Sequence, residues 1–236
     1  MTESARPSLN LIFDADDTLW ESNIHFLEAY DAFFAAAQLA GLKAERDEVQ
    51  AIVHRCELEI IKSHGYGRIP YVRALRNAAH ALTELEELRR QLEQEVERIG
   101  HQLIHRRCEV RPGVEPTLRE LRKRHTLMLF SKGQRDEQLA KLEYSGLASL
   151  FSRVEIPAEK DADAYRQLIA AAGLNPQQTF MVGNSPRSDI NPAIRAGLRA
   201  VYIPHPQTWV LEEEPLEAGE PGVIILDSFP RLLELF

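Results

Sequence analysis

The chain has 236 residues, a length that fits one large domain or two modest ones. Hydrophobic residues make up 44% and charged residues 27%, so the chain can bury a core, and its net charge of −8 argues against non-specific nucleic-acid binding. The two cysteines, Cys56 and Cys108, are isolated, which is typical of the reducing cytoplasm and argues against a disulfide framework or a zinc site. We expect no signal peptide, because residues 1–10 lack a basic region followed by an apolar stretch. We also expect no transmembrane helix, because no window approaches roughly 18 uninterrupted apolar residues.

Three aspartates follow the first apolar run of the chain. Residues 9–13 have the composition of a buried strand, and Asp14, Asp16 and Asp17 come directly after it. Like charges this close raise each other's pKa or require a cation. The pattern therefore indicates a functional group at the end of this strand.

Residues 21–106 have the character of a helical block, with no convincing strand. Apolar residues recur there at helical spacing, and glycines at positions 41 and 65 are typical of helix ends. A leucine-rich stripe in the last helix spans only about three heptads, which favours a small bundle over a coiled coil. The predicted helices span residues 26–41, 44–65, 71–82 and 82–105.

From residue 111 onward, short apolar runs alternate with helical segments. Such alternation predicts a parallel sheet covered by helices on both faces. The expected strands span residues 125–130, 151–156, 179–183, 200–204 and 222–226, and the expected helices span residues 136–147, 162–174, 188–198 and 229–236. The simplest fold class is an α/β, Rossmann-like core of residues 1–20 and 107–236, with an all-helical domain of residues 21–106 inserted after the first strand.

Polar side chains follow each of the first four predicted strands. Because functional sites of parallel sheets lie at the carboxyl ends of the strands, these loops should meet at one edge. Their agreement is more specific than any single motif. The residues concerned are Asp14, Asp16 and Thr18, then Ser131 and Lys132, then Glu159 and Lys160, and finally Asn184, Ser185 and Asp189.

These residues resemble the motifs of the haloacid dehalogenase superfamily, whose members are mostly phosphatases. The stretch 14–18 matches its D-x-D-x-T motif, and Ser131 and Lys160 match its second and third motifs. The stretch 183–189 matches its acidic fourth motif, except that Asn184 replaces the first acid. The resemblance covers nearly the whole chain, and the helical insertion resembles the family's cap domain.

The resemblance implies a phosphoryl-transfer site that contains Mg²⁺. Asp14 would be the nucleophile and a metal ligand, and Asp16 would be the general acid and base, a role that needs a raised pKa. The main-chain carbonyl of Asp16 and the carboxylate of Asp189 would complete a set of oxygen ligands suited to Mg²⁺. Asn184 can coordinate metal or orient a bound water without adding charge, so we expect weaker Mg²⁺ binding than with an acid.

The phosphate itself would be bound by Ser131 and a lysine. Ser131 and Lys160 would bind the phosphoryl oxygens and offset charge in the transition state. Lys132 follows Ser131 and could reach phosphate as well, and we favour Lys160. Thr18 would hold the turn that carries the aspartates.

Several further residues have both a functional and a structural interpretation. Residues 64–71 are predicted to form a loop in which Arg68 holds an anionic group of the substrate, although an ordinary surface turn fits equally well. Asp17 is interpreted as a structural residue, and residues 205–215 as an acidic surface loop, with packing near the site as the less favoured alternative. The pair His101 and His105 lacks an apparent third ligand, which argues against a metal site.

The sequence favours a Mg²⁺-dependent hydrolase of a small phosphorylated metabolite that acts through an aspartyl-phosphate. The alternatives are a phosphomutase of the same superfamily, then a metal-independent 2-haloacid dehalogenase, which usually lacks the second acid, and then a non-catalytic binding protein. We expect a cytoplasmic protein, and no nucleic acid, membrane or protein partner is indicated. The substrate and the oligomeric state stay open.

Overall fold

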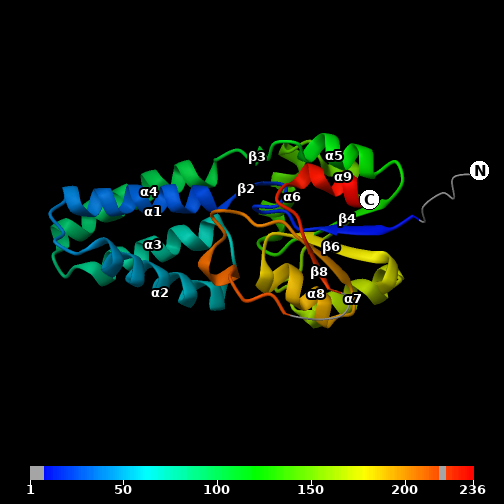
Figure 1. Ribbon diagram of the computed structural model, residues 1–236. Helices are drawn as coiled ribbons and strands as arrows, with labels where there is room; N and C mark the ends of the chain where they lie inside the picture. The colour runs from blue at the N-terminus through cyan, green and yellow to red at the C-terminus, as the bar shows by residue number, and fades with distance from the viewer. Residues whose placement is uncertain (1–7, 218–221) are drawn as a thin grey trace, which may run out of the picture. The chain divides into compact units, whose positions relative to one another are not determined.

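The computed structural model describes residues 8–217 and 222–236. The chain separates into two compact units: Met1–Glu21 with Cys108–Phe236, and Ser22–Arg107. We call the first the core unit and the second the helical unit (Figure 1). The stretch 1–10, examined above for a signal peptide, lies largely outside the described residues.

The core unit is built on a six-stranded sheet in which every neighbouring pair of strands is parallel. The strand order is β5-β4-β1-β6-β7-β8, so the first strand lies at the centre of the sheet. This arrangement confirms the predicted α/β fold class. The strands are β1 (Asn10–Phe13), β4 (Thr126–Phe130), β5 (Arg153–Glu155), β6 (Thr179–Gly183), β7 (Arg199–Tyr202) and β8 (Val223–Ile225).

Helices cover both faces of this sheet. Alternate residues of β1 point to opposite faces, so Phe13 joins a cluster with α5, α6 and α9, while Ile12 joins a cluster with α7 and α8 (Figure 1). Both β1 side chains are fully buried, which explains why this strand is uniformly apolar in sequence. The helices are α5 (Val114–Leu121), α6 (Arg135–Tyr144), α7 (Ala162–Ala172), α8 (Asn191–Arg195) and α9 (Leu232–Leu235).

Local capping signals place the helix that follows the Lys160 loop. The Asp161 side chain accepts a hydrogen bond from the Ala164 N–H (2.9 Å) at the start of α7, and Gly173 ends the helix in the left-handed conformation at φ 61°. The Asp161 cap sets where the loop between β5 and α7 ends, and the Gly173 cap sets the length of α7.

Two very short strands lie where the chain leaves the core unit and returns to it. β2 (Trp20–Glu21) pairs in antiparallel fashion with β3 (Glu109–Val110), so that Glu21 lies opposite Glu109. The sequence analysis did not predict either strand, because two residues are too few to form a recognisable pattern.

The helical unit contains α1 (Asn23–Leu39), α2 (Arg46–His64), α3 (Arg68–Leu82) and α4 (Glu86–Ile104). Its own apolar cluster includes Phe33, Leu75 and Leu92, all fully buried. The leucine stripe of α4 packs into this cluster, as expected for a bundle helix. Among the described residues, no helix combines the length and the apolar character needed to cross a membrane.

Arg68 does not lie in a long loop, because α3 begins with this residue. Its side chain is buried, and Nη1 donates to the carbonyl oxygens of Arg106 (2.7 Å) and Ile104 (3.4 Å), near the carboxyl end of α4. A guanidinium at this position satisfies carbonyl groups that a helix end leaves without intrahelical partners. These contacts are structural, and the role of Arg68 in substrate binding stays a prediction.

Candidate active site

The site begins at the turn that follows β1. The Asp14 N–H donates to the carbonyl of Val182 (2.9 Å), which extends the pairing of β1 and β6 by one residue. The chain then turns tightly, with the Leu19 N–H bound to the carbonyl of Ala15 (2.8 Å) and Asp17 in the left-handed region at φ 61°. Aspartate tolerates this conformation better than bulkier residues do.

A buried lysine lies between two buried carboxylates at the centre of the site. Lys160, only 3% exposed, donates to Asp14 Oδ1 (2.8 Å) and to Asp189 Oδ1. Burial alone would lower the pKa of Lys160, but the two carboxylates outweigh burial and hold the pKa well above its usual range. The two carboxylates therefore favour the charged form of this ammonium group.

The two carboxylates are not fully neutralised by that one lysine. Burial raises the pKa of Asp14, and the attraction of Lys160 offsets only part of the rise. Burial and the nearby Asp14 raise the pKa of Asp189 to about 7 despite the same lysine. This part of the site carries an excess of negative charge that a further cation would relieve.

Asp189 is held from several sides. It lies in a π-helical turn, Pro186–Ile190, and its Oδ2 accepts a hydrogen bond from the Ser185 N–H (2.9 Å). A Cβ on Gly183 would stand 2.2 Å from that same Oδ2, so only glycine fits at the end of β6. The glycine of the fourth motif thus makes room for the acid of the same motif.

The Thr18 hydroxyl connects the first and fourth motifs. Its Oγ1 lies 3.0 Å from Asp14 Oδ2 and 2.9 Å from Asn184 Oδ1. A hydroxyl has one hydrogen, so it donates to one of these oxygens at a time. The Asn184 amide oxygen is thereby placed next to the carboxylate of Asp14.

Asp16 has a different set of partners from Asp14. Its Oδ1 accepts hydrogen bonds from Trp20 Nε1 (2.6 Å) and Lys141 Nζ (3.0 Å), and its Oδ2 accepts from Gln138 Nε2 (2.7 Å) and Lys141 Nζ (3.1 Å). Gln138 and Lys141 are buried residues of α6 that the sequence analysis did not select. Both lie on one face of that helix, at the i, i+3 spacing.

This environment corrects the expected raised pKa of Asp16. Burial would raise the pKa, but the charge of Lys141 and the hydrogen bonds from Gln138, Lys141 and Trp20 outweigh burial and hold it below its usual range. The prediction of a raised pKa took account of the neighbouring carboxylates but not of a second lysine, Lys141. In this structure, Asp16 is a charged carboxylate with 29% of its side chain exposed.

Lys132 is paired with an acid from a distant segment. Its Nζ donates to Ser188 Oγ (3.0 Å) and to Glu212, which also accepts a hydrogen bond from Ser185 Oγ. The Glu212 side chain is only 12% exposed, so residues 205–215 are not simply the surface loop expected from their composition. Of the two candidate lysines, Lys160 contacts Asp14, whereas Lys132 contacts the fourth-motif turn.

Ser131 lies directly after β4 and is buried. Its N–H donates to the carbonyl of Glu155 in β5 (3.2 Å), and its Oγ lies 3.5 Å from the carbonyl of Lys132. The residue therefore stands at the same edge of the sheet as Asp14, because β4 and β1 are parallel neighbours.

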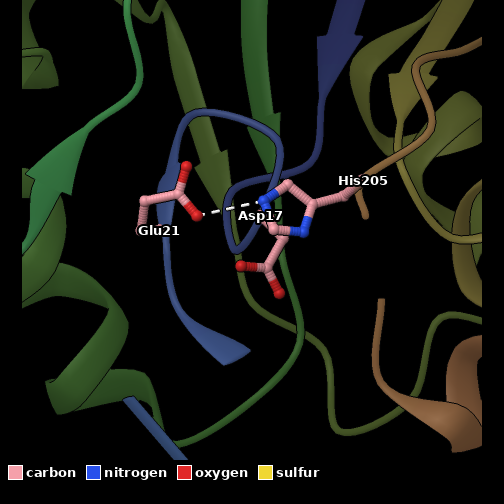
Figure 2. A group of neighbouring side chains, drawn as sticks. All are labelled: Asp17, Glu21 and His205. Atoms are coloured by element: carbon pink, nitrogen blue, oxygen red, sulfur yellow. Dashed lines mark hydrogen bonds and ion pairs between the residues drawn. The ribbon is translucent and has the colours of Figure 1, made fainter. Parts of the chain in front are cut away.

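Asp17 lies apart, in a group with Glu21 and His205 (Figure 2). His205 Nδ1 accepts a hydrogen bond from the Gln207 N–H (3.2 Å), so a neutral ring carries its proton on Nε2 and donates it to Glu21 Oε2 (3.0 Å). Arg111 Nη1 binds the main-chain carbonyl of Asp17 (2.5 Å). A metal at Nε2 would have to displace that proton, so we interpret the group as a support for the turn, consistent with the structural role predicted for Asp17.

The parallel α/β sheet, with a D-x-D-x-T turn, a buried lysine and a further acid at its strand ends, agrees with the resemblance to the haloacid dehalogenase superfamily. Comparison with protein families gives the same result: residues 10–197 match the model described as haloacid dehalogenase-like hydrolase. The chain belongs to this family. The resemblance inferred from the motifs is thereby confirmed.

Individual relatives cover the chain to different extents. A phosphoserine phosphatase of Thermus thermophilus is 38% identical over 104 residues, a segment that spans 42% of this chain and 42% of that protein. A haloacid dehalogenase-like hydrolase of Xanthomonas campestris shares the fold at a TM-score of 0.77 and 24% identity, covering 97% of this chain and 96% of its own. An L-2-haloacid dehalogenase of Xanthobacter autotrophicus also shares the fold (TM-score 0.62, 17% identity, 97% and 98% coverage), so the fold alone does not decide the reaction.

Proposed function

We propose that this protein is a Mg²⁺-dependent phosphatase that hydrolyses a small phosphorylated metabolite through an aspartyl-phosphate at Asp14. The observation that carries the proposal is that the two aspartates bind different lysines. Asp14 accepts a hydrogen bond from Lys160, and Asp16 accepts one from Lys141. A nucleophile and an acid–base group with different environments are what a two-step phosphoryl transfer requires. The segment related to a phosphoserine phosphatase gives further support.

In the first step, an Asp14 carboxylate oxygen attacks phosphorus and the bond from phosphorus to the alcohol oxygen breaks. The departing oxygen takes a proton from the Asp16 carboxyl group. Asp16 is charged in the free protein, but a bound phosphate adds negative charge nearby and raises its pKa, which favours the protonated form.

In the second step, water attacks the phosphorus of the aspartyl-phosphate and gives its proton to the Asp16 carboxylate. The bond from phosphorus to the Asp14 oxygen breaks, so phosphate leaves and both aspartates return to their starting states. Lys160 and Ser131 would bind the phosphoryl oxygens during both steps, and Lys160 would offset their negative charge. Lys160 contacts the nucleophile Asp14, whereas Lys132 binds Glu212 and Ser188, which favours Lys160 in this role.

The residues of the site fit a magnesium ion. Asp14, Asp189 and the amide oxygen of Asn184 are the kinds of oxygen donor that Mg²⁺ prefers, with the main-chain carbonyl of Asp16 as a further candidate ligand. The raised pKa values of Asp14 and Asp189 indicate that an added positive charge would stabilise the charged forms of both carboxylates. Bound Mg²⁺ would reduce the repulsion between the attacking carboxylate and the phosphate.

The alternative functions differ in the residues and metal that they require and in the products that they release. A 2-haloacid dehalogenase would use the same nucleophile without metal and without a second acid, so Asp16 argues against it. A phosphomutase would move phosphate between positions of one sugar and would release none. A non-catalytic binding protein would show neither activity.

A phosphate-release assay over a panel of phosphorylated metabolites, with phosphoserine included, tests the proposal. The wild-type protein with Mg²⁺ should release phosphate, EDTA should abolish the release, and Asp14→Asn and Asp16→Asn should each remove it. Asp227→Asn, a change of an exposed acid far along the chain from the motifs, serves as the matched control and should keep full activity. Metal-independent turnover, or full turnover by Asp14→Asn, would contradict the mechanism.

A further inference from the structure

The Asp16 carboxylate is held by α6, an element outside the family motifs. Four hydrogen bonds reach its two oxygens, and three of these come from Gln138 and Lys141. A carboxylate offers about four lone-pair positions, so these donors fix both its place and the rotation of its plane. The geometry thus determines where a proton on Asp16 would be delivered.

Lys141 differs from the other donors because it reaches both carboxylate oxygens. Its Nζ lies 3.0 Å from Oδ1 and 3.1 Å from Oδ2. When a substrate replaces Trp20 or Gln138 at one oxygen, the same ammonium can keep its hydrogen bond to the other oxygen. Neither Trp20 nor Gln138 has this property, since each contacts a single oxygen.

The lysine is itself prevented from moving away. Lys141 is buried, and its Nζ also pairs with Glu137 (3.2 Å) one helical turn earlier. A buried ammonium between two carboxylates has few alternative positions of comparable free energy, because leaving either partner uncompensated is costly. This rigidity suits a residue that orients another group.

We propose that Lys141, assisted by Gln138, is a positioning residue for the acid–base work of Asp16. The inference rests on the proposed function and adds to it a residue that none of the four motifs contains. Lys141 acts through Asp16 and does not touch the reacting atoms. Its removal should therefore affect the step in which the leaving oxygen needs a proton.

Leaving-group dependence separates this role from a merely structural one. An alkyl alcohol leaves slowly unless it receives a proton, whereas a nitrophenolate leaves readily without one. General acid catalysis typically contributes about 10²- to 10⁴-fold, and an enzyme that keeps the acid but loses its orientation should lose part of that factor. A structural defect would lower turnover of both kinds of ester alike.

The experiment measures kcat and KM with p-nitrophenyl phosphate and with the fastest of three alkyl monoesters: phosphoserine, glycerol phosphate and phosphoglycolate. Lys141→Met should lower kcat/KM, which reports formation of the aspartyl-phosphate and not its hydrolysis, by roughly 10- to 100-fold for the alkyl ester and by less than about threefold for the nitrophenyl ester. Lys141→Arg, which keeps the charge, should recover most of the alkyl activity. Lys123→Met, which removes an exposed lysine paired with Glu120, is the matched control and should change neither.

The outcomes distinguish the inference from the function on which it rests. Equal losses on both esters, no loss on either, or no recovery by Lys141→Arg would overturn the role of Lys141 while leaving the phosphatase proposal intact. A wild-type protein that releases phosphate from none of the esters would overturn the proposed function, and the inference with it. A larger loss on the alkyl ester, recovered by Lys141→Arg, would support both.

Discussion

Replacing Asp189 with asparagine should stabilise the protein when no divalent cation is present, and the gain should grow with pH. Burial and the nearby Asp14 raise the pKa of Asp189 from its ordinary value of 3.8 to about 7. Between these pH values, the folded protein holds a proton that the unfolded chain has released. The contribution of this proton to the free energy of unfolding is therefore fully present below about pH 4, and it is lost as the pH rises to about 7.

The size of the effect follows from the same two pKa values. Each tenfold change in proton affinity corresponds to about 1.4 kcal/mol, so an ionised Asp189 should cost the folded state about 4 kcal/mol at pH 8. At pH 5, the folded protein keeps the proton and only the unfolded chain releases it. The loss of stability should then be about 2 kcal/mol, because this release is less favourable at pH 5 than at pH 8. Asp189→Asn removes the charge and should recover roughly these amounts.

Urea denaturation in EDTA at pH 5 and pH 8 measures both values. The two tryptophans, Trp20 and Trp209, belong to the core unit, so their fluorescence reports on its unfolding. Asp227→Asn is a suitable control, since that side chain is 74% exposed and its removal should change stability by less than about 0.5 kcal/mol.

The reasoning would be refuted if Asp189→Asn destabilised the protein at pH 8. Such a result would mean that the attraction between Asp189 and Lys160 exceeds the cost of burying the carboxylate. Saturating Mg²⁺ should narrow the gap between wild type and variant, because a cation bound to the wild-type site stabilises the folded state alone.

Three further predictions concern the surroundings of this site. Gly183→Ala should cost about 1–3 kcal/mol of stability in the same urea assay and should abolish phosphate release, because the new Cβ would displace Asp189; an unchanged midpoint would contradict this. Asn184→Asp should tighten Mg²⁺ binding by roughly tenfold in a calorimetric titration and should lower stability in EDTA, since it adds charge to an already anionic group. Lys132→Met should cost about 2–4 kcal/mol by leaving Glu212 buried without its lysine, and adding Glu212→Gln should recover part of that loss; strictly additive effects would argue against the pairing.

The convergence of the motifs was predictable because a parallel sheet brings all carboxyl ends to one edge. β1, β4 and β6 are central, adjacent strands, and the loops that follow them hold Asp14, Ser131 and Asp189. Apolar runs of four or five residues were enough to locate those strands. The fold class and the family followed from the same pattern.

The partners of the aspartates could not be predicted in the same way. Lys141 lies in a polar helix where lysines are usually solvated, and Glu212 lies in an acidic segment without periodicity. Sequence spacing gives no information about such contacts between segments far apart in the chain. The repulsion among the aspartates did indicate that cations were needed, and the i, i+3 pair of Gln138 and Lys141 was the signal that could have located one of them.

The pairing of β2 with β3 has a consequence for how this protein can be altered. Glu21 and Glu109 are cross-strand neighbours. The chain leaves the core unit after Glu21 and returns at Glu109, and the Cα atoms of these two residues are roughly 5 Å apart. A two-residue turn such as Asn-Gly closes a gap of that size. Residues 22–108 can therefore be treated as an exchangeable module: a segment from another protein, or a simple turn, should join Glu21 to Glu109 without disturbing the strand that presents Asp14.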